Sequence, residues 1–191
     1  KPKHLELVKE HLVTEWGASI TDGYEADDAL GIAQMSFFNN DPENCTICSI
    51  DKDLKQIPGR HYNFVKREFD EVTVLQGLYN FYLQVLMGDP SDNIRGCKGI
   101  GKAKAPKILE LSGWTEFSYV SEMHFSCMEA YKQAGQTIED LDLACKLLYI
   151  LRREEDKWTP PTTLKTLVKT DSKSDVSVQS MDSSLELTKQ K

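Results

Sequence analysis

Seven acidic residues in the first half of the chain fall into three short clusters, and grouped carboxylates are common ligands of divalent cations. Glu25 and Asp28 are three residues apart, so they share one face of a helix. Asp51 and Asp53 are two residues apart, on the same side of an extended strand end. Because hard cations such as Mg²⁺ use a few carboxylates together with water and substrate phosphates, the clusters predict metal-assisted chemistry on a phosphate if the fold brings them together. The candidate ligands are Glu25, Asp27 and Asp28, then Asp51 and Asp53, and finally Asp89 and Asp92.

Each cluster also has an ordinary structural explanation. Acids at residues 25–28 suit the N-terminus of a helix, where the backbone dipole favours negative charge. The Asp-Lys-Asp sequence at 51–53 is typical of a solvated turn, and Asp89-Pro-Ser-Asp92 is typical of a cap. All three clusters, however, lie at the ends of predicted helices or strands, and the third adjoins a glycine-rich stretch. This combination favours a shared site.

The stretch that follows the third cluster is basic and contains closely spaced glycines. Residues 94–108 include five basic residues and no acidic one, and Gly99-Ile100-Gly101 lies among them before a predicted helix start. Glycines let backbone N–H groups approach an anion closely, and a helix N-terminus directs further N–H groups at it. We therefore expect contact with a nucleic-acid phosphate backbone beside the metal site, which indicates a nuclease. The candidate DNA-binding residues are Arg95, Lys98, Gly99, Ile100, Gly101, Lys102, Lys104 and Lys107.

The composition suits a folded domain that is not membrane-embedded. Of the 191 residues 40% are hydrophobic, and no apolar run approaches the ~20 residues that span a bilayer. The net charge of −7 is unusual for a nucleic-acid binder, but the basic residues are concentrated in one stripe. Divalent cations bound at the acid clusters would offset part of the negative charge. We expect a cytoplasmic protein with no membrane partner.

Hydrophobic periodicity predicts an α/β protein. The apolar run at 45–50 is typical of a buried parallel strand, and the acids at 51 and 53 then follow its carboxyl end, where open α/β sheets bind ligands. A second strand is expected at 61–65 and a short one at 18–21. Asp70 is expected to cap a helix over 71–87. Further helices are expected at 5–16, 25–38, 102–111, 116–134 and 138–151.

Three motifs resemble, in order and spacing, those of the 5′ nuclease family. This family comprises flap endonucleases, bacteriophage 5′–3′ exonucleases and the 5′-nuclease domain of bacterial DNA polymerase I. The resemblance covers about residues 1–155, and the motifs look most like those of the phage enzymes. They are GYEADDALGIA at 23–33, SIDKDLKQIP at 49–58 and GDPSDNIRGCKGIGKAKAPKIL at 88–109.

The resemblance implies a PIN-like α/β domain with a parallel sheet, followed by a helix–hairpin–helix subdomain. It implies two Mg²⁺ or Mn²⁺ ions, and a K⁺ ion at the carbonyls of the hairpin formed by Gly99, Ile100 and Gly101. We expect a partial nuclease core over residues 1–70, a DNA-binding subdomain over 71–160 and a disordered tail over 161–191. Glu25, Asp27, Asp28 and Asp51 would match the family's first metal group, and Asp51, Asp53, Asp89 and Asp92 the second.

One part of the family pattern has no counterpart in the sequence. The family begins with a strand that ends in Asp, followed by a second Asp and a basic helical arch through which the 5′ strand passes. We therefore expect the chain to lack the N-terminal part of the family pattern. The two metal ligands and the arch residues that orient the phosphate would be lacking with it.

These residues are compatible with three functions. The first is a 5′–3′ exonuclease or flap endonuclease that hydrolyses DNA phosphodiesters with two metal ions and binds 5′ ends, flaps and duplex backbone. It would act in a bacterial or phage-infected cell, and these residues do not indicate a protein partner. The second is a non-catalytic DNA-binding fragment that needs the missing segment. The third is a PIN-type ribonuclease, which the basic glycine hairpin disfavours because the hairpin suits duplex backbone.

Overall fold

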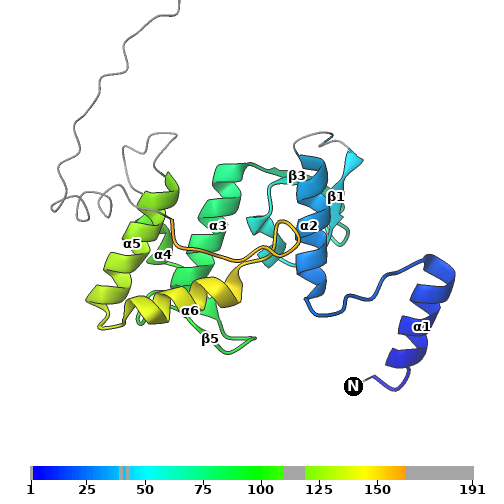
Figure 1. Cartoon of the computed structure of the whole chain (residues 1–191), viewed down its shortest axis with the longest axis horizontal. Coiled ribbons are helices and arrows are strands. Elements are labelled where there is room, and N and C mark those ends of the chain that lie inside the picture. The colour runs from blue at the N-terminus through cyan, green and yellow to red at the C-terminus, as the bar shows by residue number, and fades with distance from the viewer. Residues whose placement is uncertain (1, 39–40, 42–43, 110–118, 162–191) are drawn as a thin grey trace, which may run out of the picture. The chain divides into compact units, whose positions relative to one another are not determined.

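Helices and two small sheets make up the computed structural model, which describes residues 2–38, 41, 44–109 and 119–161 (Figure 1). The strands are β1 (Thr46–Cys48), β2 (Gly59–Asn63), β3 (Glu68–Val72), β4 (Gly88–Asp89) and β5 (Ile94–Arg95). The helices are α1 (Leu5–Trp16), α2 (Ala26–Phe38), α3 (Val74–Met87), α4 (Ala105–Leu109), α5 (Tyr119–Gln133) and α6 (Ile138–Leu148), together with the 3₁₀ helix η2 (Asp53–Gln56).

The larger sheet mixes parallel and antiparallel pairing in the order β1-β2-β3. Strands β1 and β2 are parallel, with Ile47 opposite His61, and β3 runs antiparallel to β2. Helix η2 lies in the connection from the end of β1 to the start of β2, with Asp51 two residues before it and Asp53 as its first residue. The expected α/β class and the parallel strand pair are therefore confirmed.

The expected start of the third long helix is wrong, and so is the short strand at 18–21. Asp70 does not cap a helix but lies in β3, opposite His61 of β2. Helix α3 begins three residues later, because Thr73 Oγ1 accepts the N–H of Gln76 at 3.1 Å and Gln76 Oε1 accepts the N–H of Thr73 at 2.8 Å. Residues 18–21 are irregular.

Two apolar clusters form the core of the described part of the chain. The larger surrounds α3, whose Phe81, Val85 and Leu86 are buried against the three following helices. Tyr131 of α5 donates its hydroxyl to the carbonyl of Val85 at 2.8 Å, so α3 is held by a polar contact as well. The smaller cluster consists of Ile47, Leu54, Ile57 and Ile150.

A buried glutamine connects the two clusters. Gln56, at the end of η2, is 1% exposed. Its Nε2 donates to Gln84 Oε1 at 3.1 Å and to the carbonyl of Leu148 at 2.8 Å. Its Oε1 accepts the N–H of Ile150 at 3.2 Å. These bonds hold η2, and with it Asp53 at its start, against α3 and the end of α6.

Two expectations about domain organisation remain predictions. Residues 1–161 form one compact unit, and nothing in it tests the division expected at residue 70. Apart from Pro161, the expected tail at 161–191 lies outside the described residues. Within the described ranges, no helix combines the length and the apolar character that crossing a membrane requires.

Candidate metal and nucleic-acid site

Acids from all three sequence clusters line one cavity of about 280 Å³. The amides of Gln56 and Gln84, the lysine Lys146 of α6 and apolar residues such as Ile94 complete its lining. Asp51 and Asp89 do not line the cavity. The five acids that do are Glu25, Asp27, Asp28, Asp53 and Asp92.

The first cluster is placed by the N-terminus of α2. Asp27 and Asp28 are in its first turn and are half-buried, and the exposed Glu25 precedes it. Asp27 Oδ1 accepts the N–H of Asp28 at 2.9 Å. The two carboxylate oxygens of Asp28 accept the N–H of Glu25 at 3.3 Å and the N–H of Leu151 at 2.9 Å. Asp28 therefore connects the start of α2 to the segment that follows α6.

The second cluster follows β1 and opens η2. The exposed Asp51 accepts the N–H of Asp53 on Oδ1 at 2.9 Å, so its carboxylate forms an Asx turn at the start of η2. Its own N–H donates to Ser49 Oγ at 3.0 Å. Asp53 is half-buried, and its Oδ1 lies 3.7 Å from Lys52 Nζ.

The third cluster lies in the hairpin of β4 and β5. Asp89 is 5% exposed, and its Oδ1 accepts the N–H of Ser91 at 2.7 Å, whereas Asp92 is exposed in the turn. The hairpin sits close to α3 because Gly88 and Gly96 pack backbone to backbone. A Cβ atom on Gly96 would lie 2.3 Å from the nitrogen of Gly88. Gly88 also has φ of 70°, a conformation that favours glycine.

In the first cluster, the charges of neighbouring acids help to raise the pKa values of Glu25 and Asp27. The charge of Asp27 is the main cause of the raised pKa of Glu25, and burial, Asp28 and Asp92 act in the same direction. Burial is the main cause of the raised pKa of Asp27, and the charges of Asp28 and Asp51 add to it. Negative charge from the second and third clusters therefore acts on the first.

The same coupling joins the second and third clusters. Burial is the main cause of the raised pKa of Asp53, and the charges of Asp51 and Asp89 raise it further, whereas Lys52 and a hydrogen bond from Gln84 lower it. The pKa of Asp89 is lowered, mainly because its carboxylate accepts the backbone N–H of Ser91. All seven acids are thus linked by their charges at one edge of the fold.

The chemical type of the candidate ligands suits a hard cation, but their positions do not form a complete coordination site. Every candidate ligand is a carboxylate. The pKa values of Asp27 and Asp53 are raised mainly by burial and that of Glu25 mainly by the charge of Asp27, and a divalent cation would neutralise the negative charge that contributes to all three. Among the described residues, however, no three His, Cys, Asp or Glu side chains are close enough together to hold a metal ion. Mg²⁺ commonly binds through one or two carboxylates and completes its shell with water and phosphate oxygens, so the arrangement fits that mode of binding.

The glycine hairpin exposes its backbone. Gly99 has φ of 77°, and a Cβ atom on Gly99 or Gly101 would have no atom within 4 Å. Ile100 is half-buried and packs against the larger apolar cluster. The expected helix at 102–111 begins only at Ala105, and residues 110–111 lie outside the described residues. The five basic residues expected here, Arg95, Lys98, Lys102, Lys104 and Lys107, are all exposed.

Gln136, between α5 and α6, holds the hairpin in place. Its Oε1 accepts the N–H of Lys98 at 2.6 Å, and its Nε2 donates to the carbonyl of Gly96 at 3.2 Å. The carbonyl of Gly99 accepts Lys104 Nζ at 3.1 Å, so it already has a cationic partner, and K⁺ at the hairpin stays a prediction. A groove of about 500 Å³ runs between the hairpin and α5, lined by Lys98, Lys104 and exposed glycine backbone.

Four polar residues near the acids were missed by the sequence reasoning. Gln56 and Gln84 are both buried. Gln84 interrupts an apolar run, which could have drawn attention to it, whereas Gln56 directly follows charged residues and gave no such signal. Lys52 was treated only as part of a turn, and Lys146 only as part of the expected helix. No sequence signal indicated that Lys146 would line the acid cavity.

Comparison with known proteins gives partial matches. No family model matches the chain. It is 29% identical over 107 residues to a 5′–3′ exonuclease of Halalkalibacterium halodurans, an alignment that covers 50% of this chain and 35% of that protein. It is 29% identical over 145 residues to the 5′–3′ exonuclease of Bacillus subtilis, which covers 67% of this chain and 47% of that protein. A thermostable DNA polymerase I of Thermus thermophilus is 32% identical over 160 residues, with 76% of this chain and 18% of the polymerase covered.

Solved structures of the T5 5′-exonuclease also align with the chain. A mutant of that enzyme gives a TM-score of 0.45 at 17% identity, covering 75% of this chain and 74% of that one. Its complex with divalent zinc ions gives 0.43 at 18% identity, covering 78% and 71%. The chain spans less than half the length of the two curated exonucleases. From the sequence matches to exonucleases and to DNA polymerase I, the aligned part of the chain is a member of the 5′ nuclease family.

Proposed function

We propose that this chain is the metal-binding and DNA-binding part of a 5′–3′ exonuclease with flap endonuclease activity that hydrolyses DNA phosphodiesters. The observation that carries the proposal is the shared cavity at which Glu25, Asp53 and Asp92, from three separate sequence clusters, meet. Its relatives named 5′–3′ exonuclease and DNA polymerase I support the reaction class.

The seven acids would hold two Mg²⁺ or Mn²⁺ ions in two overlapping groups. When bound, such ions lower the pKa of a water molecule and stabilise a leaving oxygen. Within the protein, Asp28 and Gln56 hold the cavity walls together. The half-buried Asp53 lines the cavity, and the buried Asp89 acts on Asp53 through its charge. The first group is Glu25, Asp27, Asp28 and Asp51, and the second is Asp51, Asp53, Asp89 and Asp92.

The hairpin would grip the DNA through its phosphates. The backbone is open at Gly99 and Gly101, and Lys98 and Lys102 are exposed cations. These groups suit contacts with DNA phosphates, and phosphate contacts carry no information about base sequence. Binding should therefore weaken with salt and show little preference for sequence. A duplex of RNA tested at the same salt concentration separates this function from that of a ribonuclease.

Cleavage of a 5′-flap DNA substrate tests the proposal. We expect Mg²⁺-dependent cleavage by the chain that EDTA abolishes. We expect Asp53→Asn to reduce the rate at least about a hundredfold, since loss of a metal's outer-shell partners alone costs 10–100-fold. The control, Asp22→Asn, changes an exposed acid that does not line the cavity. Calorimetry that detects no divalent cation binding, even with DNA present, would show the site assignment to be wrong.

A second candidate function is DNA binding without catalysis by this chain alone. It is favoured by the lack, among the described residues, of three ligands close enough to hold a metal ion, and by the partial coverage of the relatives. The same cleavage assay separates the two functions when it is repeated with an N-terminal segment taken from a related exonuclease. Cleavage only after this addition supports the second function, and cleavage by the chain alone excludes it.

A further inference from the structure

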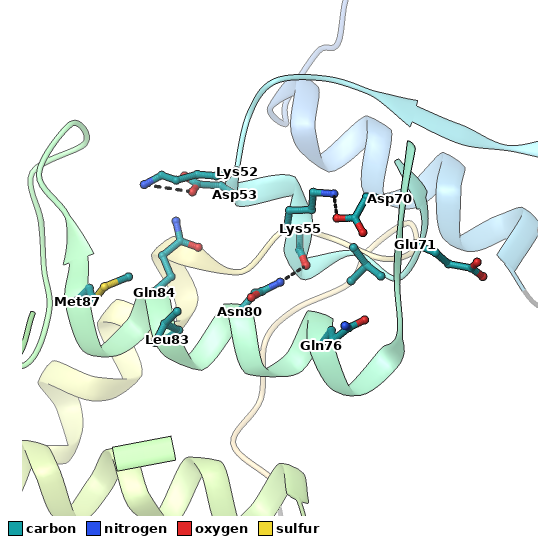
Figure 2. Close-up of a pocket in the computed structure, with 11 residues that line it drawn as sticks. Lys52, Asp53, Lys55, Asp70, Glu71, Gln76, Asn80, Leu83, Gln84 and Met87 are labelled. Carbon is teal, nitrogen blue, oxygen red and sulfur yellow. Dashed lines mark hydrogen bonds and ion pairs between the residues drawn. The ribbon is translucent and has the colours of Figure 1, made fainter. Parts of the chain in front are cut away.

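Lys52 lies between two of the acids, at the carboxyl end of β1. Its Nζ is 3.7 Å from Asp53 Oδ1, and its side chain is 79% exposed while that of Asp53 is 25% exposed. Its positive charge also acts on Asp89, in the neighbouring hairpin. In Figure 2 Lys52 extends beside Asp53, on the side of Gln84 and away from Asp70. A cation therefore stands at the edge of the acid cluster and is reachable from solvent.

The ion pair of Lys52 with Asp53 is weak. Strong bonds between an ammonium group and a carboxylate are about 2.7–2.9 Å long, and exposed pairs typically contribute no more than about 1 kcal/mol. Lys55, on the same helical turn, differs: its Nζ lies 2.5 Å from Asp70 Oδ2, and Asn80 donates to its carbonyl at 2.9 Å (Figure 2). Lys55 is therefore already paired, whereas little free energy opposes a change of partner by Lys52.

Asp53 and Gln84 border two adjoining hollows. One is the acid cavity, and the other is a groove of about 360 Å³ whose lining includes Lys52, Lys55 and the amides of Gln76 and Asn80. A DNA strand with one phosphate at the acid cavity needs a positive group beside it, because seven carboxylates at this edge repel phosphate. Two lysines line the groove, and Lys55 is already paired with Asp70. Lys52, which is only weakly paired, is therefore the lysine whose ammonium group can supply that charge.

We propose that Lys52 binds a DNA phosphate next to the acid cavity and leaves Asp53 for it when divalent cations neutralise the carboxylates. This inference rests on the proposed nuclease function. Lys52 then has two positions, one on Asp53 without divalent cation and one on phosphate with it. A residue that only balances the charge of Asp53 would not contact DNA in either condition.

Salt-dependent DNA binding distinguishes these roles. The anisotropy of a fluorescent 5′-flap duplex is measured with the full chain at 50–200 mM salt, in Ca²⁺ and in EDTA. In Ca²⁺ we expect Lys52→Ala to weaken DNA binding about tenfold, the usual effect of losing a hydrogen bond to a charged group. The slope of log K against log salt should become less steep by about 0.9, because one phosphate contact is lost. Lys52→Arg should keep both values. In EDTA, Lys52→Ala and the parent chain should bind alike.

Lys66→Ala is the matched control, since Lys66 is an exposed lysine in the turn between β2 and β3 that lines neither hollow. A slope for Lys52→Ala equal to that of the parent in Ca²⁺ overturns the inference and leaves the proposed function standing. A parent chain that binds no DNA overturns both. Circular dichroism establishes that each variant is folded, which the exposure of Lys52 leads us to expect.

Discussion

The carboxylate of Asp28 accepts a 2.9 Å hydrogen bond from the backbone N–H of Leu151, which lies 123 positions further along the chain. Through its other oxygen the same carboxylate accepts the N–H of Glu25 at 3.3 Å. A residue expected to bind metal therefore also fixes the start of α2 to the segment after α6. A structural role and an expected metal-binding role meet in one side chain, and variants can separate them.

Asp28→Ala should lower the free energy of unfolding by about 1–3 kcal/mol, because it leaves a half-buried backbone N–H without its acceptor. Asp28→Asn should lower it less, since the amide oxygen still accepts one bond. Urea denaturation without divalent cation measures both. Asp22→Ala is the control at an exposed turn, and an equal midpoint for this control and Asp28→Ala would contradict the structural role.

Gln56→Ala should destabilise the chain by about 2–3 kcal/mol, because the buried carbonyl of Leu148 and the N–H of Ile150 both lose their partner. The change should also reduce divalent cation binding, since Gln56 holds η2 and Asp53 in place. Thermal unfolding and calorimetry provide the two measurements. Gln133→Ala, at an exposed position of α5, should stay within about 0.5 kcal/mol of the parent.

Asp27→Asn should stabilise the chain at pH 7. Burial, together with the charges of Asp28 and Asp51, raises the pKa of Asp27 above the 3.8 of an unperturbed Asp. The ionised carboxylate therefore destabilises the folded state at neutral pH, and this penalty disappears as the pH falls through the raised pKa to below 3.8. Urea midpoints of the variant and the parent should converge at low pH.

Added Mg²⁺ at pH 7 should narrow the same difference, because the cation stabilises the parent more than Asp27→Asn. A variant that is less stable than the parent at pH 7 would contradict this account of Asp27. Asp22→Asn, an exposed acid away from the cavity, provides the baseline for removing one negative charge.

Gly96→Ala and Gly101→Ala should have opposite consequences. A Cβ on Gly96 would lie 2.3 Å from the nitrogen of Gly88, so this variant should lose about 1–3 kcal/mol of stability or more. A Cβ on Gly101 would have no atom within 4 Å, so the fold should tolerate it. If DNA approaches this backbone, Gly101→Ala should weaken DNA binding. Denaturation and anisotropy on both variants test the pair.

Gln136→Ala should weaken DNA binding while costing about 1–2 kcal/mol of stability, because the hairpin loses its bonds at Lys98 and Gly96. Thr14→Ala, at an exposed position of α1 that does not line the groove beside the hairpin, should leave DNA affinity unchanged. The two variants are compared by anisotropy with the same flap duplex. Equal affinities for both would mean that the hairpin does not need Gln136 to bind DNA.

Local patterns predicted the elements whose stability is local. The helix expected at 25–38 is found at Ala26–Phe38, and that expected at 138–151 is found at Ile138–Leu148. The expectation at Asp70 was wrong because β3 depends on pairing with β2, and a strand partner cannot be read from the segment itself. The capping box of Thr73 and Gln76 was present in the sequence and would have placed the start of α3 correctly.

The sequence by itself determined the chemical type of the candidate ligands, their three clusters and the position of the glycine hairpin, since these depend on residue type and short spacing. Only the tertiary structure decided that Glu25, Asp53 and Asp92 share a cavity, and that Asp51 and Asp89 act on it through their charges without lining it. The physical reason is that carboxylates repel one another. They are held together by bonds that the packed core makes elsewhere, such as those of Gln56 to residues 92 and 94 positions away.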